Sequence, residues 1–458
     1  MAFGGNIAAI KPLSFSHGVH PEEYKQLSCN NPIERMPFVA EYILPLGQHI
    51  GAPSKPIVRK GQKVFRGQKI ADPEGFVSVA LHAPVDGTID AIDLFTHPNG
   101  QELPAIKIKC DTFSSQLVTP QEAGDPENMD LPEFISAIQE AGLVGLGGAA
   151  FPAHVKFSIP EDKTCKYFMV NGCECEPFLT ADDRLMVEYA EELLDGIEIL
   201  NRFIKAEKLY VAVEINKQEA IRVLSEKAVG RNYPIEIVPL KVKYPQGAEK
   251  MIISAILGKE IPAGKLPLDI EVLVSNVGTM VAMSQYFRKG QPLIERVITV
   301  TGTVLGRPTN VMVPIGTPMI ELVNWCGGIT SDAARVLLGG PMMGMVQKRL
   351  DVPVIKGTSG ILALSDHEAG VMTEYSCIRC GRCVDACPIF LNPSLLGMLA
   401  KKGFWDEMAE NNVMDCFECA ACSFVCPSAI PLVQNFRVAK GFIKEKAARE
   451  KFENRNSV

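Results

Sequence analysis

The sequence predicts a multidomain α/β protein, with β-rich parts on both sides of a parallel sheet and a helical, cysteine-bearing C-terminal domain. Three observations support this. The chain has 458 residues, whereas a single core seldom grows beyond ~250–300 residues. Short apolar runs alternate with amphipathic stretches through its middle, which is typical of a parallel sheet covered by helices. Eight of its 14 cysteines lie close together near the C-terminus.

The N-terminal part is expected to be a strap, residues 1–40, followed by a small all-β domain, residues 41–112. Gly and Pro punctuate short alternating apolar runs in the second part, as in strands joined by turns. The segment GQKVFRGQKIADPEGFVSVALHAPVDGTI resembles a lipoyl- or biotinyl-type hammerhead, in which a hairpin lysine carries the cofactor. That position falls on Phe76, so the resemblance implies the shape without a modifiable lysine.

An α/β domain is expected at residues 130–290, after a polar linker. Buried strands are predicted at Leu209–Ile215, Ile235–Leu240 and Ile270–Ser275, with helices near Asp182–Phe203 and Lys217–Val229 between them. This alternation indicates a largely parallel sheet. Residues 291–350 are strand-rich again and suggest a small β-grasp-like domain, and residues 365–442 are expected to be helical.

The composition argues against two classes of function. A formal net charge of −7 argues against nucleic-acid binding, which needs a basic face. No apolar run approaches the ~20 residues that cross a bilayer, and no secretory signal opens the chain. We therefore expect a soluble, cytoplasmic protein that meets a membrane through its partners. The scattered cysteines are interpreted as core or incidental residues: Cys29, Cys110, Cys165, Cys173, Cys175 and Cys326.

Two cysteine runs near the C-terminus carry the most specific motif. CIRCGRCVDACP and CFECAACSFVCP both have the spacing C-x2-C-x2-C-x3-C-P. In two-cluster ferredoxins the first three cysteines of each run bind one 4Fe–4S cluster and the fourth binds the other. The pattern predicts one cluster on Cys377, Cys380, Cys383 and Cys426, and a second on Cys416, Cys419, Cys422 and Cys387. Zinc, which favours paired C-x2-C with four ligands per site, is the alternative, together with chance.

A glycine-rich segment, GLVGLGGAAFPAHVK at residues 142–156, is a candidate phosphate cradle. Glycines let backbone amides approach a phosphate, and Lys156 can supply a point charge. A tight turn explains the same glycines, and no clear strand precedes them as in the usual dinucleotide fingerprint. The acidic segment VNGCECEPFLTADDRLM follows. Its glutamates, at alternating positions beside cysteines, can bind hydroxyls of a ribose or ribityl chain, or lie in a solvated turn, and its C-x-C is too short a pattern for a metal site.

Together these segments resemble the RnfC subunit of the Rnf electron-transport complex over essentially the whole chain. The middle is more distantly similar to the flavin-bearing, NADH-binding subunit of respiratory complex I. The resemblance is carried by FSHGVHP, GLGGAAFPAHVK, VNGCECEPFLTADDRLM, KYPQGAEKMI, SNVGTM and the two cysteine runs. It implies a Rossmann-like FMN and NAD(H) domain at 130–290, a soluble-ligand-binding β-grasp domain at 291–350, and a two-cluster ferredoxin-type domain at 365–442.

The resemblance also implies roles for single residues. Those expected at FMN are Gly145, Gly147, Gly148, Lys156, Asn171, Glu174, Gly247, Ala248, Glu249, Asn276 and Thr279. Phe151 is expected to stack on NADH and Glu176 to hydrogen-bond to it. The sequence departs from the complex I relative at Leu146, Ala150, Cys173 and Ala248, where that relative has an arginine, a glycine and two acidic residues. That relative also carries one cluster where this chain has two.

The implied activity is hydride exchange between NAD(H) and FMN, with single electrons moving between FMN and the clusters. No acid–base residue is required, because the protein supplies position and electrostatics. The family implies a peripheral arm at the cytoplasmic face of the inner membrane. Its complex includes a ferredoxin-like subunit and couples ferredoxin and NAD+ chemistry to Na+ or H+ translocation. The alternatives are a cobalamin reductase of propanediol utilisation, and a non-catalytic electron-conducting or docking subunit without its own flavin.

Overall fold

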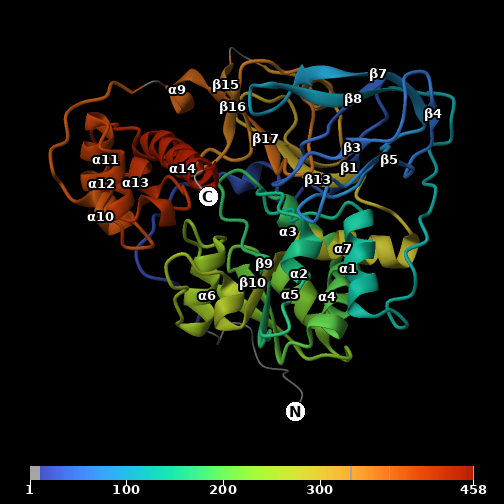
Figure 1. Ribbon diagram of the computed structural model, residues 1–458, viewed down its shortest axis with the longest axis horizontal. Coiled ribbons are helices and arrows are strands. Elements are labelled where there is room, and N and C mark those ends of the chain that lie inside the picture. Colours follow the sequence, from blue (N-terminus) through green and yellow to red (C-terminus); the bar gives the residue numbers. More distant parts are fainter. Residues whose placement is uncertain (1–10, 331–332, 371, 457–458) are drawn as a thin grey trace.

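The computed structural model describes residues 11–330, 333–370 and 372–456. The first ten residues of the predicted strap lie outside these ranges. Figure 1 shows two β-rich parts above a parallel sheet with its helices, and a helical C-terminal domain at one side. The predicted fold class, a multidomain α/β protein, is confirmed.

Two antiparallel sheets build the N-terminal β domain and share one apolar core. Their orders are β2-β8-β7-β4 and β3-β5-β6. The strands are β2 (Glu41–Pro45), β3 (Lys55–Pro56), β4 (Lys63–Val64), β5 (Lys69–Asp72), β6 (Leu81–His82), β7 (Gly87–Thr96) and β8 (Glu102–Cys110). Alternate residues of β2, such as Tyr42 and Leu44, are buried, as expected for a strand with one face in a core. Phe76 lies exposed in the connection between β5 and β6.

The parallel sheet has four strands in the order β11-β10-β9-β12. They are β9 (Tyr167–Gly172), β10 (Lys208–Glu214), β11 (Ile235–Leu240) and β12 (Val272–Asn276). The accompanying helices are α1 (Leu131–Glu140), α2 (Ala153–Phe157), α3 (Ala181–Glu188), α4 (Ala190–Ile204), α5 (Gln218–Ala228), α6 (Glu249–Leu257), η3 (Pro267–Ile270) and α7 (Val277–Lys289). The sequence predicted β10, β11 and β12, but not β9.

Local sequence explains where several of these helices begin. The Asp130 carboxylate accepts the backbone N–H of Glu133, and the Glu133 carboxylate accepts that of Asp130, so a capping box starts α1. Asn276 caps α7 by accepting the N–H of Gly278 at 2.8 Å. The single helix predicted near Asp182–Phe203 is instead divided into α3 and α4 at Tyr189.

A six-stranded mixed sheet follows in the chain, in the order β1-β14-β13-β17-β15-β16. The strands are β1 (Ile33–Arg35), β13 (Glu295–Thr301), β14 (Thr309–Pro314), β15 (Ala333–Leu338), β16 (Met345–Gln347) and β17 (Gly360–Ser365), with helices α8 (Met319–Trp325) and α9 (Asp366–Ala369). Every residue of β13 and β14 is buried, as in strands covered on both faces. The sheet takes β1 from the strap and β17 from beyond residue 350.

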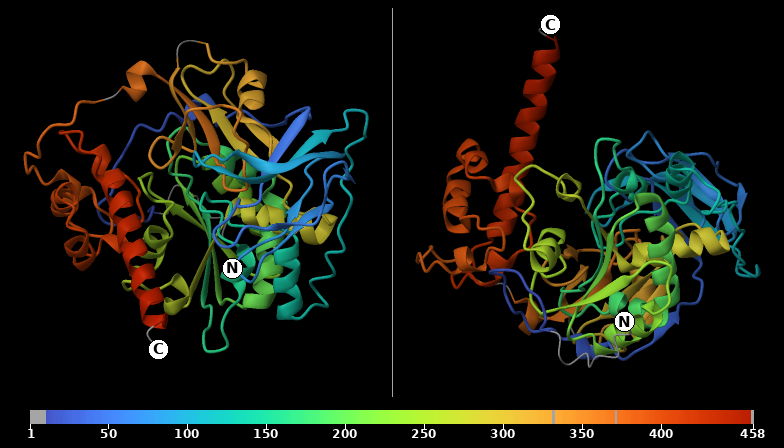
Figure 2. Two further views of the ribbon diagram at one scale, coloured as in Figure 1. Left: turned by 45° about the horizontal axis from the view of Figure 1, so that its top comes forward. Right: turned by 90° about the horizontal axis from the view of Figure 1, so that it is seen from below.

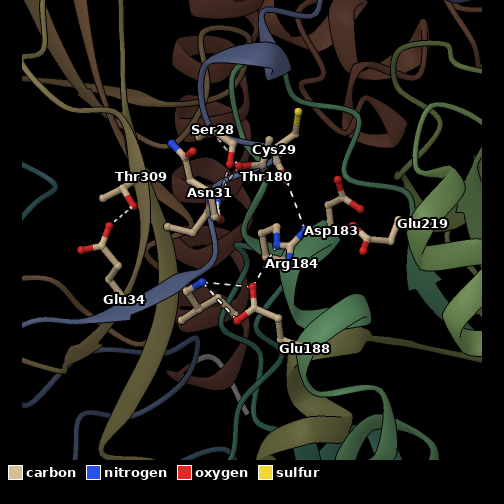
Figure 3. Close-up of polar contacts among 12 residues, drawn as sticks. Ser28, Cys29, Asn31, Glu34, Thr180, Asp183, Arg184, Glu188, Glu219 and Thr309 are labelled. Carbon is tan, nitrogen blue, oxygen red and sulfur yellow. Dashed lines mark hydrogen bonds and ion pairs between the residues drawn. The ribbon is translucent and has the colours of Figure 1, made fainter.

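Residues 28–35 of the strap lie between helix α3 and this six-stranded sheet. Ile33 on β1 pairs in parallel with Asn310 on β14. Figure 3 shows the same part of the strap against α3: the hydroxyls of Ser28 and Thr180 are 2.7 Å apart, and the Glu188 carboxylate accepts the N–H of Ile33 at 3.0 Å. The strap is therefore a structural element that joins two sheets.

The C-terminal domain is helical. It contains α10 (Arg382–Ala386), α11 (Pro393–Lys402), α12 (Trp405–Glu410), η4 (Val413–Asp415), α13 (Ala421–Phe424) and α14 (Leu432–Asn456). The far end of α14 projects away from the body of the molecule (Figure 2). Within the described ranges, no helix combines the length and apolar character needed to span a bilayer.

Candidate functional site

The order of the parallel sheet gives its carboxyl edge a switch point, the place where a ligand crevice is expected. From β9 the chain moves through β10 to β11 on one side and then returns to place β12 on the other side of β9. Ligands of open α/β sheets bind at such a point, outside the carboxyl ends of the strands. Here β9 ends with Asn171-Gly172 and β12 ends with Asn276. Both asparagines are among the residues predicted to bind FMN.

The glycine-rich loop between α1 and α2 closes over this edge. The Gly145 N–H donates to the Phe151 carbonyl at 2.8 Å, so the loop is a tight turn. The Leu146 N–H donates to the Thr279 hydroxyl at 3.0 Å. At Gly148 φ is +106°, and an added Cβ would meet no atom within 4 Å. The backbone of the loop is therefore held from one side and open at Gly148, as a phosphate cradle requires.

A second loop, after β11, reaches the same edge. The Asn171 amide donates to the Gly247 carbonyl at 2.8 Å, and its oxygen accepts the Cys173 N–H at 2.9 Å. A Cβ at Gly247 would collide with the Cys173 carbonyl, so only glycine fits there. The neighbouring Gln246 is fully buried, yet neither polar atom of its side chain has a protein partner. Unpaired buried amides are rare, so this one fits a pocket that receives a polar ligand.

Lys156 and Glu249 meet at the outer part of the crevice. Lys156 Nζ lies 2.6 Å from Glu249 Oε1, and each side chain is about one third exposed (33% and 36%). Lys156 comes from α2, after the glycine-rich loop, and Glu249 opens α6. Both were predicted to contact FMN, and the structure brings them together as an ion pair.

An acidic group lies where α3 begins. The Glu174 carboxylate accepts the N–H groups of Asp182 and Asp183 at 3.1 and 3.3 Å, and Asn276 donates its amide to Asp182 Oδ2 at 2.8 Å. Burial, together with the charge of Glu174, raises the pKa of Asp182 above its usual range. Burial also raises the pKa of Asp183 to about 6. Asp182 was not among the predicted site residues, although its position in TADDR, before a helix, is a signal for it.

Glu176 is covered by the six-stranded sheet. Its carboxylate accepts the N–H groups of Met342 and Met343, after β15, at 3.1 and 2.9 Å. A Cβ at Gly340 would collide with the Glu176 carboxylate. Burial raises the pKa of Glu176 to about 7, against the lowering effect of these two hydrogen bonds. Phe151, the other predicted NADH contact, is half-buried at the far end of the glycine-rich loop.

Lys25 of the strap fixes the segment that carries these acidic residues. It lies on η2 (Lys25–Leu27) and is buried. Its ammonium group donates to the carbonyls of Glu174, Glu176 and Leu179 at 2.7, 3.0 and 2.6 Å. Burial lowers the pKa of Lys25. The three carbonyls supply partners for a cation that would be costly to bury unpaired.

The eight C-terminal cysteines gather in two groups of four. Cys377, Cys380, Cys383 and Cys426, here called the outer cysteine set, line a cavity of about 230 Å³. Cys387, Cys416, Cys419 and Cys422, here called the inner cysteine set, line a second, smaller cavity. Each set takes three cysteines from one run and one from the other, as the spacing predicted. Cys377 and Cys380 are exposed, whereas Cys387, Cys419 and Cys422 are buried.

Both cysteine runs fold in the same way. Positive φ angles occur at Arg379 and Gly381 in the first run and at the matching Glu418 and Ala420 in the second. The Arg379 N–H lies 3.4 Å from Cys377 Sγ, and the Glu418 N–H lies 3.4 Å from Cys416 Sγ. Alternating left-handed residues turn successive N–H groups toward one centre, which suits an anionic ligand. The donor set and the turns therefore fit iron–sulfur clusters.

Four family models match successive parts of the chain. They are the RnfC barrel sandwich hybrid domain at residues 13–113, the Nuo51 FMN-binding domain at 138–285, the SLBB domain at 297–346 and the 4Fe-4S dicluster domain at 376–430. The FMN-binding match contains the glycine-rich loop and the carboxyl edge of the sheet. The dicluster match contains all eight clustered cysteines.

Curated relatives match nearly the whole chain. It is 41% identical to the C subunit of the proton-translocating ferredoxin:NAD(+) oxidoreductase complex of Clostridium ljungdahlii, over 96% of each chain. It is 41% identical to the C subunit of the Na(+)-translocating complex of Acetobacterium woodii, over 94% of this chain and 97% of that one. The chain belongs to the RnfC family, the C subunits of ion-translocating ferredoxin:NAD(+) oxidoreductases. The Rhodobacter capsulatus member, the C subunit of an ion-translocating oxidoreductase complex, is 42% identical over 96% of this chain and 85% of its own.

A solved structure shares the fold of this RnfC family member. The NAD+-reducing NiFe hydrogenase in its H2-reduced state matches with a TM-score of 0.50 and 20% identity, over 69% of this chain and 63% of that chain.

According to the family models, the RnfC family member contains an FMN-binding domain and a 4Fe–4S dicluster domain, in agreement with the predicted cofactors.

Proposed function

We propose that this RnfC family member exchanges hydride between NAD(H) and FMN and passes single electrons to or from two 4Fe–4S clusters. The proposal extends the family assignment, which establishes an electron-transfer subunit of an ion-translocating ferredoxin:NAD(+) oxidoreductase complex. The observation that carries it is the presence, in one chain, of an open glycine cradle at a sheet's switch point and of two four-cysteine cavities.

At the crevice the chain's own residues would bind and orient the flavin and NADH, and they would exclude water. We assign the phosphate to Gly145, Gly147 and Gly148, with Lys156 and Glu249 at the crevice's outer part. Asn171, Glu174, Gly247, Asn276 and Thr279 are assigned to the remaining flavin contacts, and Phe151 and Glu176 to NADH. Bound FMN supplies the chemistry that a nicotinamide lacks, since it accepts two electrons together and releases them singly. Electrons would leave through the inner and outer cysteine sets.

The names of the relatives support the setting proposed for this protein. Both closely matching complexes are named as ion-translocating ferredoxin:NAD(+) oxidoreductases, one for protons and one for Na(+). We infer a peripheral place at the cytoplasmic face of the inner membrane, with partners in the complex that include a ferredoxin-like subunit.

The test is a flavin and iron assay on gently purified protein. We expect about one FMN and eight iron atoms per chain, and NADH should bleach the flavin absorbance and then reduce the clusters. Protein with eight irons but no flavin would favour the docking-subunit alternative and overturn the proposal. Flavin that NADH does not bleach would overturn the hydride step alone.

A further inference from the structure

The cysteine-bearing domain is held to the rest of the molecule through the inner cysteine set. The segment that leads into it, residues 372–380, is exposed throughout. Three hydrogen bonds join the domain to the remainder of the described chain: His17 Nδ1 with the Cys387 carbonyl at 3.2 Å, the Gly18 N–H to the Ala386 carbonyl at 3.2 Å, and the Tyr244 hydroxyl to the Cys419 carbonyl at 2.8 Å. Each ends on an inner-set cysteine or its neighbour.

The strap segment FSHGV, residues 15–19, takes part on both sides of this contact. Val19 and Tyr244 exchange backbone hydrogen bonds at 2.8 and 2.9 Å, which anchors the strap to the flavin domain. The His17 ring packs edge-on against Phe390, with centroids 4.6 Å apart, which anchors it to the cysteine-bearing domain. Gly18 has φ +82°, and a Cβ there would lie 2.7 Å from the Tyr244 carbonyl oxygen. The sequence motif is therefore needed for a close fit between two domains.

Tyr244 connects this contact with the flavin site. It is 1% exposed and packs in one apolar cluster with Val19, Ala386, Cys419 and Ala421. It also belongs to the loop that carries Gln246 and Gly247 at the crevice. Tyr244 thus lies in the flavin loop, and its hydroxyl donates to the backbone carbonyl of an inner-set cysteine.

We propose that residues 15–19 and Tyr244 form an interdomain clasp that holds the inner cysteine set against the flavin domain. Tyr244 is then a positioning residue for the cluster in that set. A hydrogen bond to the Cys419 carbonyl fixes the turn that carries this cysteine, and the hydroxyl dipole favours the added negative charge of a reduced cluster. The clasp as a structural contact does not depend on the proposed function. Only its role in electron transfer between the flavin and the inner cluster rests on that function.

The test compares Tyr244→Phe with wild type and with Tyr42→Phe. The control also removes one buried tyrosine hydroxyl, which accepts the Val39 N–H at 2.9 Å in the N-terminal β domain. Hydrogen exchange of the peptides around Val19 and residue 244 should become about fivefold faster in Tyr244→Phe, the effect of losing one net hydrogen bond. In a mediator titration, the inner cluster should become harder to reduce while the outer cluster is unchanged. Neither change is expected in Tyr42→Phe.

Gly18→Ala is the second variant, since its added methyl group should wedge the clasp open and accelerate exchange further. Unchanged exchange and unchanged inner-cluster potential in Tyr244→Phe, or an equal change in Tyr42→Phe, would overturn the clasp. Hydrogen exchange needs no electron donor and the titration uses chemical mediators, so neither readout needs NADH. A protein whose flavin NADH cannot reduce would therefore overturn the hydride step of the proposed function and still leave the clasp testable.

Discussion

Replacing Glu176 with Gln should change how the stability of the six-stranded sheet depends on pH. The pKa of Glu176 rises from 4.5 to about 7 because its carboxylate is buried under the loop after β15. A raised folded-state pKa means that the contribution of Glu176 to stability is fully present below about pH 4.5 and is lost as the pH rises through about 7. The difference is worth about 3 kcal/mol, at about 1.4 kcal/mol for each tenfold change in the protonation equilibrium.

Gln carries no charge at any of these pH values, so the variant lacks this loss. Relative to wild type, Glu176→Gln should therefore gain about 3 kcal/mol between pH 4.5 and pH 8. The measurement is urea unfolding across that range, followed by fluorescence. The chain has 2 tryptophans, and a Trp405→Phe background leaves Trp325, on α8 of the relevant sheet, as the reporter. Parallel stability curves for the two proteins would refute this reasoning, because the carboxyl group would then titrate alike folded and unfolded.

Three further predictions concern the cofactors. Lys156→Ala should weaken FMN binding about tenfold in a flavin titration, the typical loss for a hydrogen bond to a charged group, with iron content unchanged; full affinity would reject this contact. Cys380→Ala should remove about four irons per chain in an iron assay, because each cubane needs its full set of thiolates, and unaltered iron would reject the ligand assignment. The outer cluster should have the higher reduction potential, since Arg379 and Arg382 add positive charge beside it. Arg379→Gln/Arg382→Gln should lower that potential by about 20–90 mV per charge, for a charge about 8 Å away; a redox titration that finds no decrease, or a more negative outer cluster in wild type, would contradict it.

Features encoded by local spacing could be predicted from the sequence. The cysteine runs have the same spacing, and the structure sorts them into the crossed sets that this spacing implies. β11 was predicted at Ile235–Leu240 and is found there, because a short, mostly apolar segment (IEIVPL) that follows a turn signal needs little context. For the glycine-rich loop the sequence left a phosphate cradle and a tight turn as alternatives, and the structure shows a tight turn that is open at Gly148.

Features that depend on distant partners could not be predicted in this way. β9 has a short apolar run, Phe168 to Val170, and becomes a strand by pairing with β10 and β12 on its two sides. Glu176 meets N–H groups 166 and 167 residues away. From the sequence alone, Glu418, between Cys416 and Cys419, would place an uncompensated negative charge beside the inner cysteine set. In the structure Lys440 and Arg437 bind it at 2.8 and 2.9 Å and, against the effect of burial, hold its pKa below the usual value. The predicted higher reduction potential of the outer cluster therefore depends mainly on Arg379 and Arg382.

The position of the strap has a consequence for the order in which the molecule can assemble. Ile33 pairs with Asn310, and the Asn31 amide donates to a carbonyl 277 residues further along. At about 5–20 residues per second, a ribosome needs roughly 15–55 s to make that stretch. Contacts so distant in sequence form late, because closing a long loop is entropically unfavourable. During synthesis Lys25 has the backbone carbonyls of its site available long before β1 has a neighbouring strand. The strap thus leaves the ribosome long before the strand with which it pairs, and it is among the last segments to reach its final place. A bulky fusion partner attached ahead of it should therefore slow this last step of folding.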